Sequence, residues 1–331
     1  MASALLSFKT RPVEIVVNDH SIRYIELKNS DEPIPYKWGE RYLPPGIVKE
    51  GKIVDRESLS IILEECIDVW KIKRRKVRFL VPNPSVTIRK LPIPADLNID
   101  EIQGYLYMEI GDTIHLPFEE PVFDFIVLPQ QEEKREILLF AAHREHVTAY
   151  SELFSSVKLT PVAADLSSLA LYRLYHHLTE KPETENLLII QFDLDHVNMS
   201  IFENEIPFFT RHQDISFDPN LWDTTVGRSG FQQLTYKGDM KELTVQLDEV
   251  TKEINMMIDF YQFSLNQGKN ELTKILVTGD HPFLGTIQEE LQKQFDFPID
   301  ILDSSSQIST EKNRPLPSSH YLALGLALKE V

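Results

Sequence analysis

Apolar and polar positions near the beginning of the chain alternate in the manner of β-strands. Residues 13–27 (VEIVVNDHSIRYIEL) form two apolar runs separated by polar residues 18–20, an order typical of a hairpin. Proline-rich and charged sequence follows to about Pro45, and we expect a loop there. Residues 56–70 then carry apolar side chains at helical spacing, and residues 77–81 form a short strand. The pattern predicts an α/β unit.

A different pattern begins at Ser85 and predicts an inserted α+β unit. Its expected elements are a strand over 86–91, a helix over 100–113, strands over 123–129 and 136–143, and a helix over 144–157. Residues 162–178, which follow Pro161, have the spacing of a helix that returns to the first unit.

The second half of the chain repeats the opening of the first half. Residues 187–191, 197–202 and 207–213 form a strand-turn-strand series like that of residues 13–27, which indicates internal pseudo-symmetry. A long amphipathic helix is predicted over residues 247–265. Another strand, helix and strand follow between residues 272 and 302.

Composition and charge narrow the class of protein. With 331 residues and 42% hydrophobic residues, the chain can bury a large core in two lobes. Its 34 basic and 51 acidic residues leave a formal charge of -17, which repels nucleic-acid backbones and anionic lipids. The single cysteine, Cys66, has no disulfide partner within the chain. No run reaches the roughly 18 apolar residues of a membrane span. We expect a cytoplasmic protein that binds no nucleic acid and does not insert into the membrane.

Four segments between Leu43 and Val147 occur in an order that core packing does not demand. They read LPPGIVKEGKIVD, VRFLVPNPSVTIRKLPIP, EEPVFDFIVL and ILLFAAHREHV. Together with the C-terminal LALGLALKEV, they resemble the PilM family of type IV pilus assembly proteins, which is actin-like and related to the cell-division protein FtsA. The likeness covers nearly the whole chain. The related GspL protein of type II secretion continues into a membrane anchor, which we do not expect here.

The resemblance implies an actin-like (ribonuclease H-like) two-lobed α/β fold. The first lobe would comprise residues 12–84 and 158–182, and an inserted α+β subdomain of the FtsA/PilM type would occupy residues 85–157. Residues 186–331 would form the second lobe. Its outer subdomain, around residues 214–246, is expected to be reduced because few residues separate the flanking elements.

The phosphate-binding turns of the family are altered in this chain. The first turn of the family reads roughly D-I-G-S-S-S-x-K, and the matching positions here are Val16, Asn18, His20, Ser21 and Arg23. The second turn reads D-I-G-A, and here it has become Gln191, Phe192, Asp193 and Leu194. Glycine is needed where the backbone passes close to a phosphate, and a carboxylate repels one. We expect Phe192 and Asp193, with their neighbours, to fill the space between the lobes.

Some residues of the family's nucleotide site are kept. The resemblance implies a relic site made of Ser21, Arg23, Glu253, Thr278 and Gly279, although Asp280 replaces the second glycine of the family's T-G-G turn. The alternative is that Gly279 closes a turn and Glu253 is a surface residue. We favour this alternative because a phosphate cradle needs several aligned donors. No cofactor is expected, and ATP with Mg²⁺ is disfavoured.

No metal centre or nucleophilic enzyme site is expected. His143, Glu145 and His146 lie where a strand is predicted to meet a helix, and they lack the i, i+4 histidine spacing of a helical metal site. The adjacent His176 and His177 would point about 100° apart on a helix, and we expect both at the surface.

The inserted unit is the part that keeps closest to the family. In PilM-like proteins this unit and the first lobe form a groove for a short N-terminal peptide of the membrane protein PilN. Such a groove can hold an extended peptide by main-chain pairing. The resemblance implies that the peptide meets the following residues: Val86, Ile88, Arg89, Leu91 and Ile93. The alternative interpretation is that these residues alternate between the faces of an ordinary β-sheet and bind no partner, and it accounts for each residue equally well.

Three functions follow from these expectations. The leading hypothesis is a non-catalytic scaffold of a type IV pilus or competence-type assembly machine, held at the inner face of the cytoplasmic membrane by a PilN-like bitopic protein, with a pilus motor ATPase as a second implied partner. The alternative is an ATP-binding or weakly ATP-hydrolysing protein. A phosphotransferase is the least supported, because neither Gln191 nor Val16 can serve as base or metal ligand.

Overall fold

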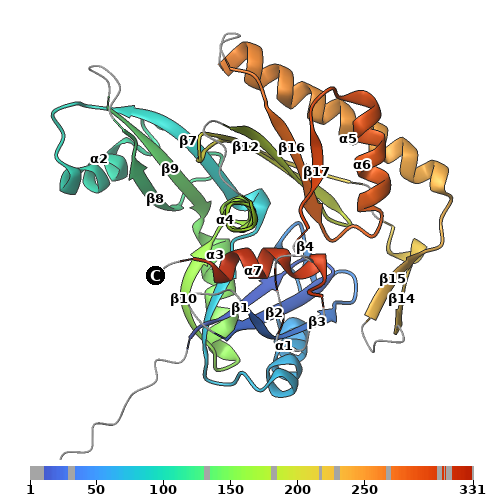
Figure 1. Ribbon diagram of the computed structural model, residues 1–331. Helices are drawn as coiled ribbons and strands as arrows, with labels where there is room; N and C mark the ends of the chain where they lie inside the picture. Colours follow the sequence, from blue (N-terminus) through green and yellow to red (C-terminus); the bar gives the residue numbers. More distant parts are fainter. Residues whose placement is uncertain are drawn as a thin grey trace, which may run out of the picture.

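The computed structural model describes residues 11–28, 34–129, 135–179, 185–215, 218–226, 232–265, 270–303, 308, 310 and 315–329. Within these ranges the chain forms two five-stranded sheets, one three-stranded sheet and two short hairpins, with helices packed on and between them. Figure 1 shows the two large sheets one above the other, with helices α4 (Ser167–Leu178) and α7 (Tyr321–Ala327) between them.

The first lobe contains a mixed five-stranded sheet. Its order is β10-β6-β1-β2-β3, with the following bounds: β1 Val13–Val17, β2 Ser21–Leu27, β3 Pro35–Tyr42, β6 Lys76–Leu80 and β10 Thr160–Asp165. The first three strands are antiparallel, and β6 and β10 continue the sheet in parallel. The expected hairpin over residues 13–27 is confirmed.

The expected loop before Pro45 is wrong over residues 35–42, which form strand β3 and pair with β2. An edge strand tolerates a proline at its first residue and charged side chains toward solvent, so the composition of residues 35–42 misled the sequence prediction. The expected helix from residue 162 is also wrong at its beginning. Residues 160–165 form β10, which pairs in parallel with β6, and helix α4 spans Ser167–Leu178. Pairing with a buried neighbour overrides the local spacing.

The second lobe repeats the arrangement of the first. Its sheet has the order β13-β12-β11-β16-β17, again three antiparallel strands followed by two parallel ones. The bounds are β11 Asn186–Phe192, β12 His196–Glu203, β13 Ile206–Asp214, β16 Lys274–Gly279 and β17 Ile299–Ile301. Helices α5 (Met240–Asp259) and α6 (Leu284–Gln294) pack on this sheet. The predicted pseudo-symmetry is therefore confirmed.

A smaller sheet lies beside the first lobe and corresponds to the residues of the expected insertion. Its order is β7-β9-β8, with bounds Val86–Ile93, Arg135–His143 and Pro121–Val127. Helix α2 (Ile102–Glu109) packs on it, and α3 (Arg144–Ser156) follows β9. The helix expected over residues 100–113 ends early, because Gly111 adopts a positive φ of 97° in the turn after α2.

Helix α1 (Arg56–Trp70) completes the first lobe. Asp55 is its N-cap, and the Asp55 carboxylate accepts a hydrogen bond from the Ser58 amide. Lys71 is its C-cap and has a left-handed backbone conformation. The remaining elements are β4 Val48–Lys49, β5 Lys52–Ile53, β14 Trp222–Val226, β15 Gln232–Tyr236, α7 Tyr321–Ala327, 3₁₀ turns at Asn83–Ser85, Ile99–Glu101, Pro219–Leu221 and Ser318–His320, and a π-helical turn at Phe260–Leu265.

Helices α4 and α7 lie between the two large sheets and join them (Figure 1). Their buried side chains share one apolar core with residues of both sheets, including Val16 of β1 and Leu276 of β16. The backbones of the helices approach so closely that a Cβ on Gly325 would lie 2.1 Å from the Ala170 carbonyl oxygen. The two lobes therefore share one continuous hydrophobic core, which is formed around α4 and α7.

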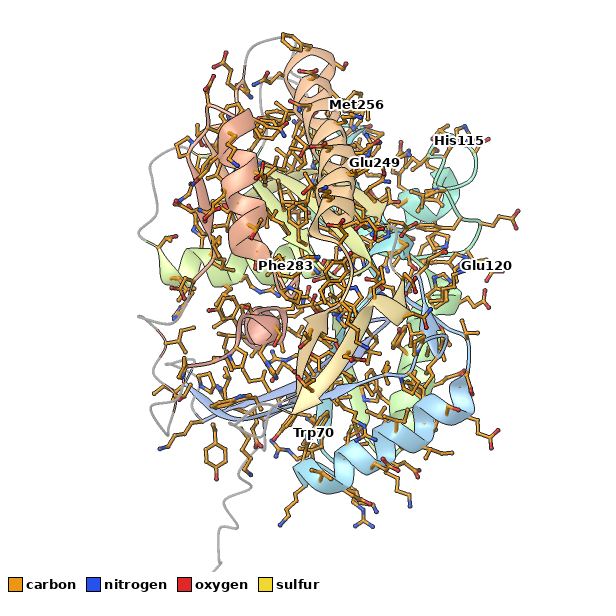
Figure 2. All side chains as sticks on the ribbon, turned by 90° about the vertical axis from the view of Figure 1, so that its right-hand side faces the viewer. Trp70, His115, Glu120, Glu249, Met256 and Phe283 are labelled. Carbon is orange, nitrogen blue, oxygen red and sulfur yellow. The ribbon has the colours of Figure 1, made fainter. Side chains whose placement is uncertain are left out.

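Hairpin β14–β15 extends from the second lobe toward the first (Figure 2). Strand β15 contacts β3, the outer strand of the first lobe's sheet. This hairpin occupies the region where a reduced outer subdomain was expected, and it closes one side of the space between the lobes.

Candidate functional site

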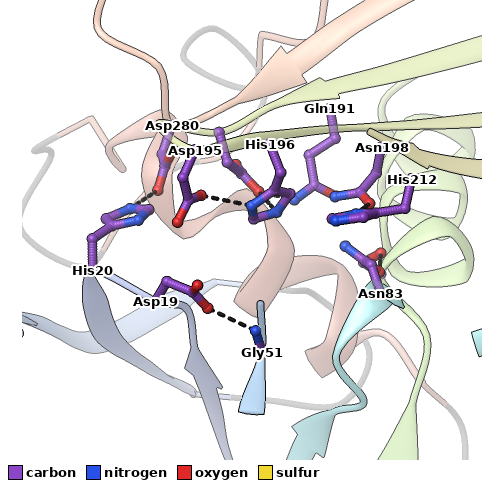
Figure 3. Close-up of polar contacts among 12 residues, drawn as sticks. Asp19, His20, Gly51, Asn83, Gln191, Asp195, His196, Asn198, His212 and Asp280 are labelled. Carbon is purple, nitrogen blue, oxygen red and sulfur yellow. Dashed lines mark hydrogen bonds and ion pairs between the residues drawn. The ribbon is translucent and has the colours of Figure 1, made fainter. Parts of the chain in front are cut away.

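The turns of the two pseudo-symmetric hairpins face each other across the cleft. In the first lobe the Asn18 amide donates to the Ser21 carbonyl oxygen, and in the second the Asp193 amide donates to the His196 carbonyl oxygen. Between the turns lies a cavity of about 500 Å³. Figure 3 shows Asp19 on the first-lobe side and Asp195 and His196 on the opposite side. This volume is within the range of small-molecule sites.

The cavity is not filled as expected. Phe192 is 1% exposed and packs in the core of the second lobe, so it does not enter the cleft. Asp193 does line the cavity. The inward direction of Phe192 follows from its position at the end of β11, because alternate side chains of a strand point to opposite faces of the sheet.

Carboxylates dominate the polar part of the cavity wall, which includes Asp19, Glu50, Asp193, Asp195 and Asp214. The Asp19 carboxylate accepts hydrogen bonds from the amides of Glu50 and Gly51 at 2.5 and 2.8 Å. Burial nevertheless raises the pKa of Asp19. Burial also raises the pKa of Asp193, and the nearby charge of Asp280 adds to this effect. Burial thus already disfavours the charged forms of these carboxylates, and an anionic ligand beside them would add further repulsion.

His196 lies between two of these carboxylates. Its Nε2 is 3.0 Å from Asp193 Oδ2, and its Nδ1 is 2.6 Å from Asp195 Oδ1. Burial alone would lower the pKa of His196, but hydrogen bonds to both carboxylates raise it well above the ordinary value. The imidazolium form can donate through both nitrogens, which this geometry requires. Beside it, His212 Nδ1 lies 2.7 Å from Asn198 Oδ1, and His212 Nε2 lies 3.0 Å from Asp214 Oδ1.

A second cluster joins the two lobes next to the cavity. The fully buried guanidinium of Arg23 on β2 donates from Nη1 to Asp280 Oδ2 at 2.5 Å and from Nε to Glu40 Oε1 at 2.5 Å. His20 Nε2 is 2.8 Å from the same oxygen of Asp280. Burial would raise the pKa of Asp280, but the charges of His20 and Arg23 hold it well below the ordinary value. The residue that replaces the second glycine of the family's turn is thus an internal anion.

The structure does not bring the five residues of the expected relic site together around the large cavity. Arg23, Thr278 and Gly279 line a separate space of about 10 Å³, which is near the minimum for one water molecule. Ser21 is buried on β2. Glu253 lies on α5 and forms an ion pair with Arg211 of β13. The 500 Å³ cavity is lined by other residues.

The residues of the large cavity carry a sequence signal that the motif comparison missed. Asp19 and His20 in the first turn are repeated as Asp195 and His196 in the second. Both pairs line the cavity, although they are one position out of register, because the Asn18–Ser21 hydrogen bond of the first turn corresponds to the Asp193–His196 hydrogen bond of the second. His212 and Asp214 gave no such signal, because their approach depends on the register of β13 with β12.

The expected partner-binding residues all belong to β7, an edge strand of the small sheet. Val86 and Ile88 pack in a cluster that includes Ile206 of the second lobe, whereas Leu91 and Ile93 pack toward α2. Arg89 is exposed, and its Nη1 donates to the His115 carbonyl oxygen at 2.6 Å. Their role in partner binding stays a prediction.

The histidine groups considered as metal ligands are arranged as follows. His143 and His146 stack their rings with centroids 4.5 Å apart, and Ser85 Oγ contacts His146 Nδ1. Helix α3 begins at Arg144, as expected. His176 contacts the rings of Tyr172 and Tyr175 and is only partly exposed, while His177 is exposed. The described part of the chain contains no group of three or more potential metal ligands.

None of the described helices is both long enough and apolar enough to cross a membrane.

Comparison with known proteins identifies the family. Residues 15–217 match the sequence model of the type IV pilus assembly protein PilM. Among solved structures, the PilM-PilN type IV pilus biogenesis complex has a chain with 18% identity and a TM-score of 0.77, and the alignment covers 97% of this chain and 98% of that chain.

Two further solved structures match over most of the chain at lower identity. The ethanolamine utilization protein EutJ from Carboxydothermus hydrogenoformans has 11% identity and a TM-score of 0.50, with 96% of this chain and 89% of that chain covered. The cytoplasmic domain of EpsL from Vibrio cholerae has 11% identity and a TM-score of 0.46, with coverage of 96% and 94%. The expected actin-like fold is confirmed, and the family match covers more than half of the sequence. This chain therefore belongs to the PilM family of type IV pilus assembly proteins.

Proposed function

We propose that this protein is a non-catalytic scaffold of a type IV pilus or competence-type assembly machine, which binds the N-terminal cytoplasmic tail of a PilN-like membrane protein. The proposal places it at the inner face of the cytoplasmic membrane, held there by that partner, with a pilus motor ATPase as a further partner. Membership of the PilM family supports a role in pilus assembly. The similar solved structure is a PilM-PilN complex, which supports the choice of partner.

The observation that carries the non-catalytic part is the ion pair between Arg23 and Asp280. A phosphate site needs free donors, yet Arg23 directs Nη1 to Asp280 and Nε to Glu40. The carboxylates of Asp19 and Asp193 line the cavity where phosphates would have to lie. Bringing a triphosphate there would place like charges together in a partly desolvated cleft, which costs more than in water.

Tail binding is supported by the position of β7 at the edge of its sheet. An edge strand presents unpaired backbone groups to which an extended peptide can add. Pro92 lies within this strand, and a proline without an N–H donor is compatible with an edge position. The charged Arg89 and Lys90 are exposed on the strand, so an acidic or neutral segment would be accepted more readily than a basic one.

Peptide binding tests the scaffold proposal. A synthetic peptide of the cytoplasmic tail of the bitopic protein encoded beside this one is titrated by fluorescence polarisation. We expect saturable binding that weakens at least about tenfold in Arg89→Glu, because the variant reverses an exposed charge beside the binding edge. Lys241→Glu, the same charge change on the exposed first turn of α5, serves as the control and is expected to bind normally. Absence of binding by the unmodified protein would refute the partner assignment.

Nucleotide binding tests the non-catalytic part separately. We expect calorimetric titration with Mg-ATP to show no heat of binding above dilution. The competing proposal, an ATP-binding protein, retains support from the cavity of about 500 Å³ and from the Thr278-Gly279 turn, which resembles the start of the family's T-G-G turn. It predicts a measurable affinity that is lost when Gly279 is altered. Such an affinity would contradict the expectation that the cleft takes no nucleotide, without affecting the peptide result.

A further inference from the structure

The cavity between the hairpin turns has the features of a built ligand site. Its lining comes from both lobes, and Trp222 and Leu234 of hairpin β14–β15 close one side. A cavity of about 500 Å³ can enclose most of a small organic molecule. The scaffold function and the tail-binding edge of β7 make no use of this space.

Two buried side chains that line the cavity keep an oxygen without a hydrogen bond. Gln191 is 3% exposed and Asp193 is 1% exposed. The Gln191 amide nitrogen donates to Asp193 Oδ2, and His196 lies on the same oxygen. Gln191 Oε1 and Asp193 Oδ1 have no partner among the residues that the structure describes. Buried acceptors of this kind are costly unless a donor meets them, so a ligand that lies against these two oxygens must supply donors. On the first-lobe side of the cavity, Asn18 Nδ2 and His20 Nδ1 have no partner among the described residues.

The charges around the cavity indicate what kind of donor fits. Five carboxylates line it, and the ionisable basic groups on the same wall are Lys49 and the three histidines His20, His196 and His212. The histidines are already in contact with acceptors: His20 with Asp280, His196 with Asp193 and Asp195, and His212 with Asn198 and Asp214. Even with His196 protonated between two of them, the five carboxylates outnumber the cationic groups on the wall, and a positively charged donor can neutralise this excess.

The rest of the wall is apolar. Leu43, Val48, Ile215 and Leu234 line it together with the indole of Trp222. A hydrocarbon or aromatic body would bury its surface against these side chains, and an aromatic face near a cation adds a favourable electrostatic contact. An inorganic cation would leave this apolar wall unused.

We propose that the interlobe cleft of this protein binds a small organic cation, a protonated amine or amidinium carried on an apolar or aromatic body, with its N–H donors on Asp193 and Gln191. The cleft that binds an anionic nucleotide in the family's motif pattern would thus bind a cationic ligand in this protein. The Arg23 guanidinium is already paired with Asp280, so it does not repel a cationic ligand in the cleft as an unpaired guanidinium would.

Benzamidine and benzamide give a direct test, because they have the same shape and differ in charge and in donors. Isothermal titration of the full-length protein is expected to give a dissociation constant for benzamidine at least about tenfold lower than for benzamide, a difference of about 1.4 kcal/mol. Equal affinities, or no binding of benzamidine up to its solubility limit, would overturn the proposal.

Variants locate the site. Asp193→Asn keeps the side-chain shape and is expected to weaken benzamidine at least fivefold while leaving benzamide unchanged. Asp214→Asn, at the exposed rim of the cavity, provides a second variant whose folding does not depend on a buried carboxylate, with an expected loss of two- to threefold. Asp296→Asn, an exposed residue outside the cavity wall, is the control. Unchanged benzamidine affinity in both Asp193→Asn and Asp214→Asn would place the binding elsewhere and refute the site.

Discussion

Asp280, the residue after β16, forms an ion pair with Arg23 of β2 across the cleft, with 2.5 Å between Oδ2 and Nη1. The two residues are 257 positions apart in the sequence, and each is almost fully buried. A buried guanidinium requires an anion, and here the protein supplies it from the opposite lobe. The position that is a glycine in the family's turn thus joins the halves of the molecule directly.

Asp280→Asn is expected to lower the free energy of unfolding by about 3 kcal/mol, because it leaves the buried Arg23 without its charged partner. His20 loses the same partner. Urea unfolding followed by circular dichroism measures the change. Glu290→Gln is the control, since it removes an exposed ion pair with Lys293 and should cost less than about 1 kcal/mol. Equal effects of the two variants would show that the interlobe pair contributes no more than a surface pair.

Gly279→Ala is expected to destabilise the protein by about 3 kcal/mol or more. Gly279 has a φ of 123°, and a Cβ there would lie 1.9 Å from the Phe192 carbonyl oxygen. Both the backbone conformation and the contact exclude an L side chain without displacement of β11.

Gly285→Ala is the matched control for Gly279. A Cβ on Gly285, in the first turn of α6, meets no atom within 4 Å, so the variant should be neutral or more stable by up to about 1 kcal/mol. Thermal unfolding of both variants beside the unmodified protein gives the comparison. A Gly279→Ala protein as stable as Gly285→Ala would mean that the β16 turn is not held against Phe192.

Much of the fold could be predicted from the sequence, and the errors have physical reasons. The two hairpins and their pseudo-symmetry are local patterns of apolar runs and turns, and both were found. Strand β10 was not, because its residues become a strand only through parallel pairing with β6. Strand β3 was missed because an edge strand can have the composition of a loop.

The candidate site was less accessible to sequence reasoning. The loss of the glycines in both turns is visible in the sequence, and it led to the expectation that ATP is disfavoured. The partner of Asp280 was not predictable, because no local pattern connects residues 23 and 280. Phe192 was wrongly expected in the cleft, since its direction depends on the pleat of β11. Spacing along the chain reports local geometry, whereas the cavity wall is assembled from two lobes and a hairpin.

The pH dependence of stability provides a test of the buried His320, which is 1% exposed and whose Nε2 lies 3.2 Å from the Gly39 carbonyl oxygen. Burial lowers its pKa to about 3. The unfolded state takes up a proton near pH 6.5 whereas the folded state does not, so stability falls as the pH decreases below about 6.5. At pH 5 the loss from this one group is about 2 kcal/mol.

His320→Asn removes that proton uptake. Urea unfolding at pH 7, 6 and 5 should show a smaller loss of stability in the variant than in the unmodified protein, by about 2 kcal/mol between pH 7 and pH 5. The comparison cancels the contributions of other groups, including His196, whose raised pKa acts in the opposite direction. Identical pH profiles would mean that His320 becomes protonated within the folded protein.

The thiol of Cys66 reports on opening of the first lobe. It is the single cysteine of the chain, lies 5% exposed on the inner face of α1, and burial raises its pKa to about 11. At pH 8 only about one thiol in a thousand would be ionised, and the thiolate is the reactive form. We expect Ellman's reagent to react at least about 100-fold more slowly with the native protein than with the protein in 6 M guanidinium chloride.

The reaction requires α1 to move away from the sheet, so the native rate measures the population of that opened state. The control variant Ser60→Ala, on the same helix, should leave this rate nearly unchanged. A native rate close to the denatured one would show that α1 separates from the sheet in the folded protein, contrary to its packing here.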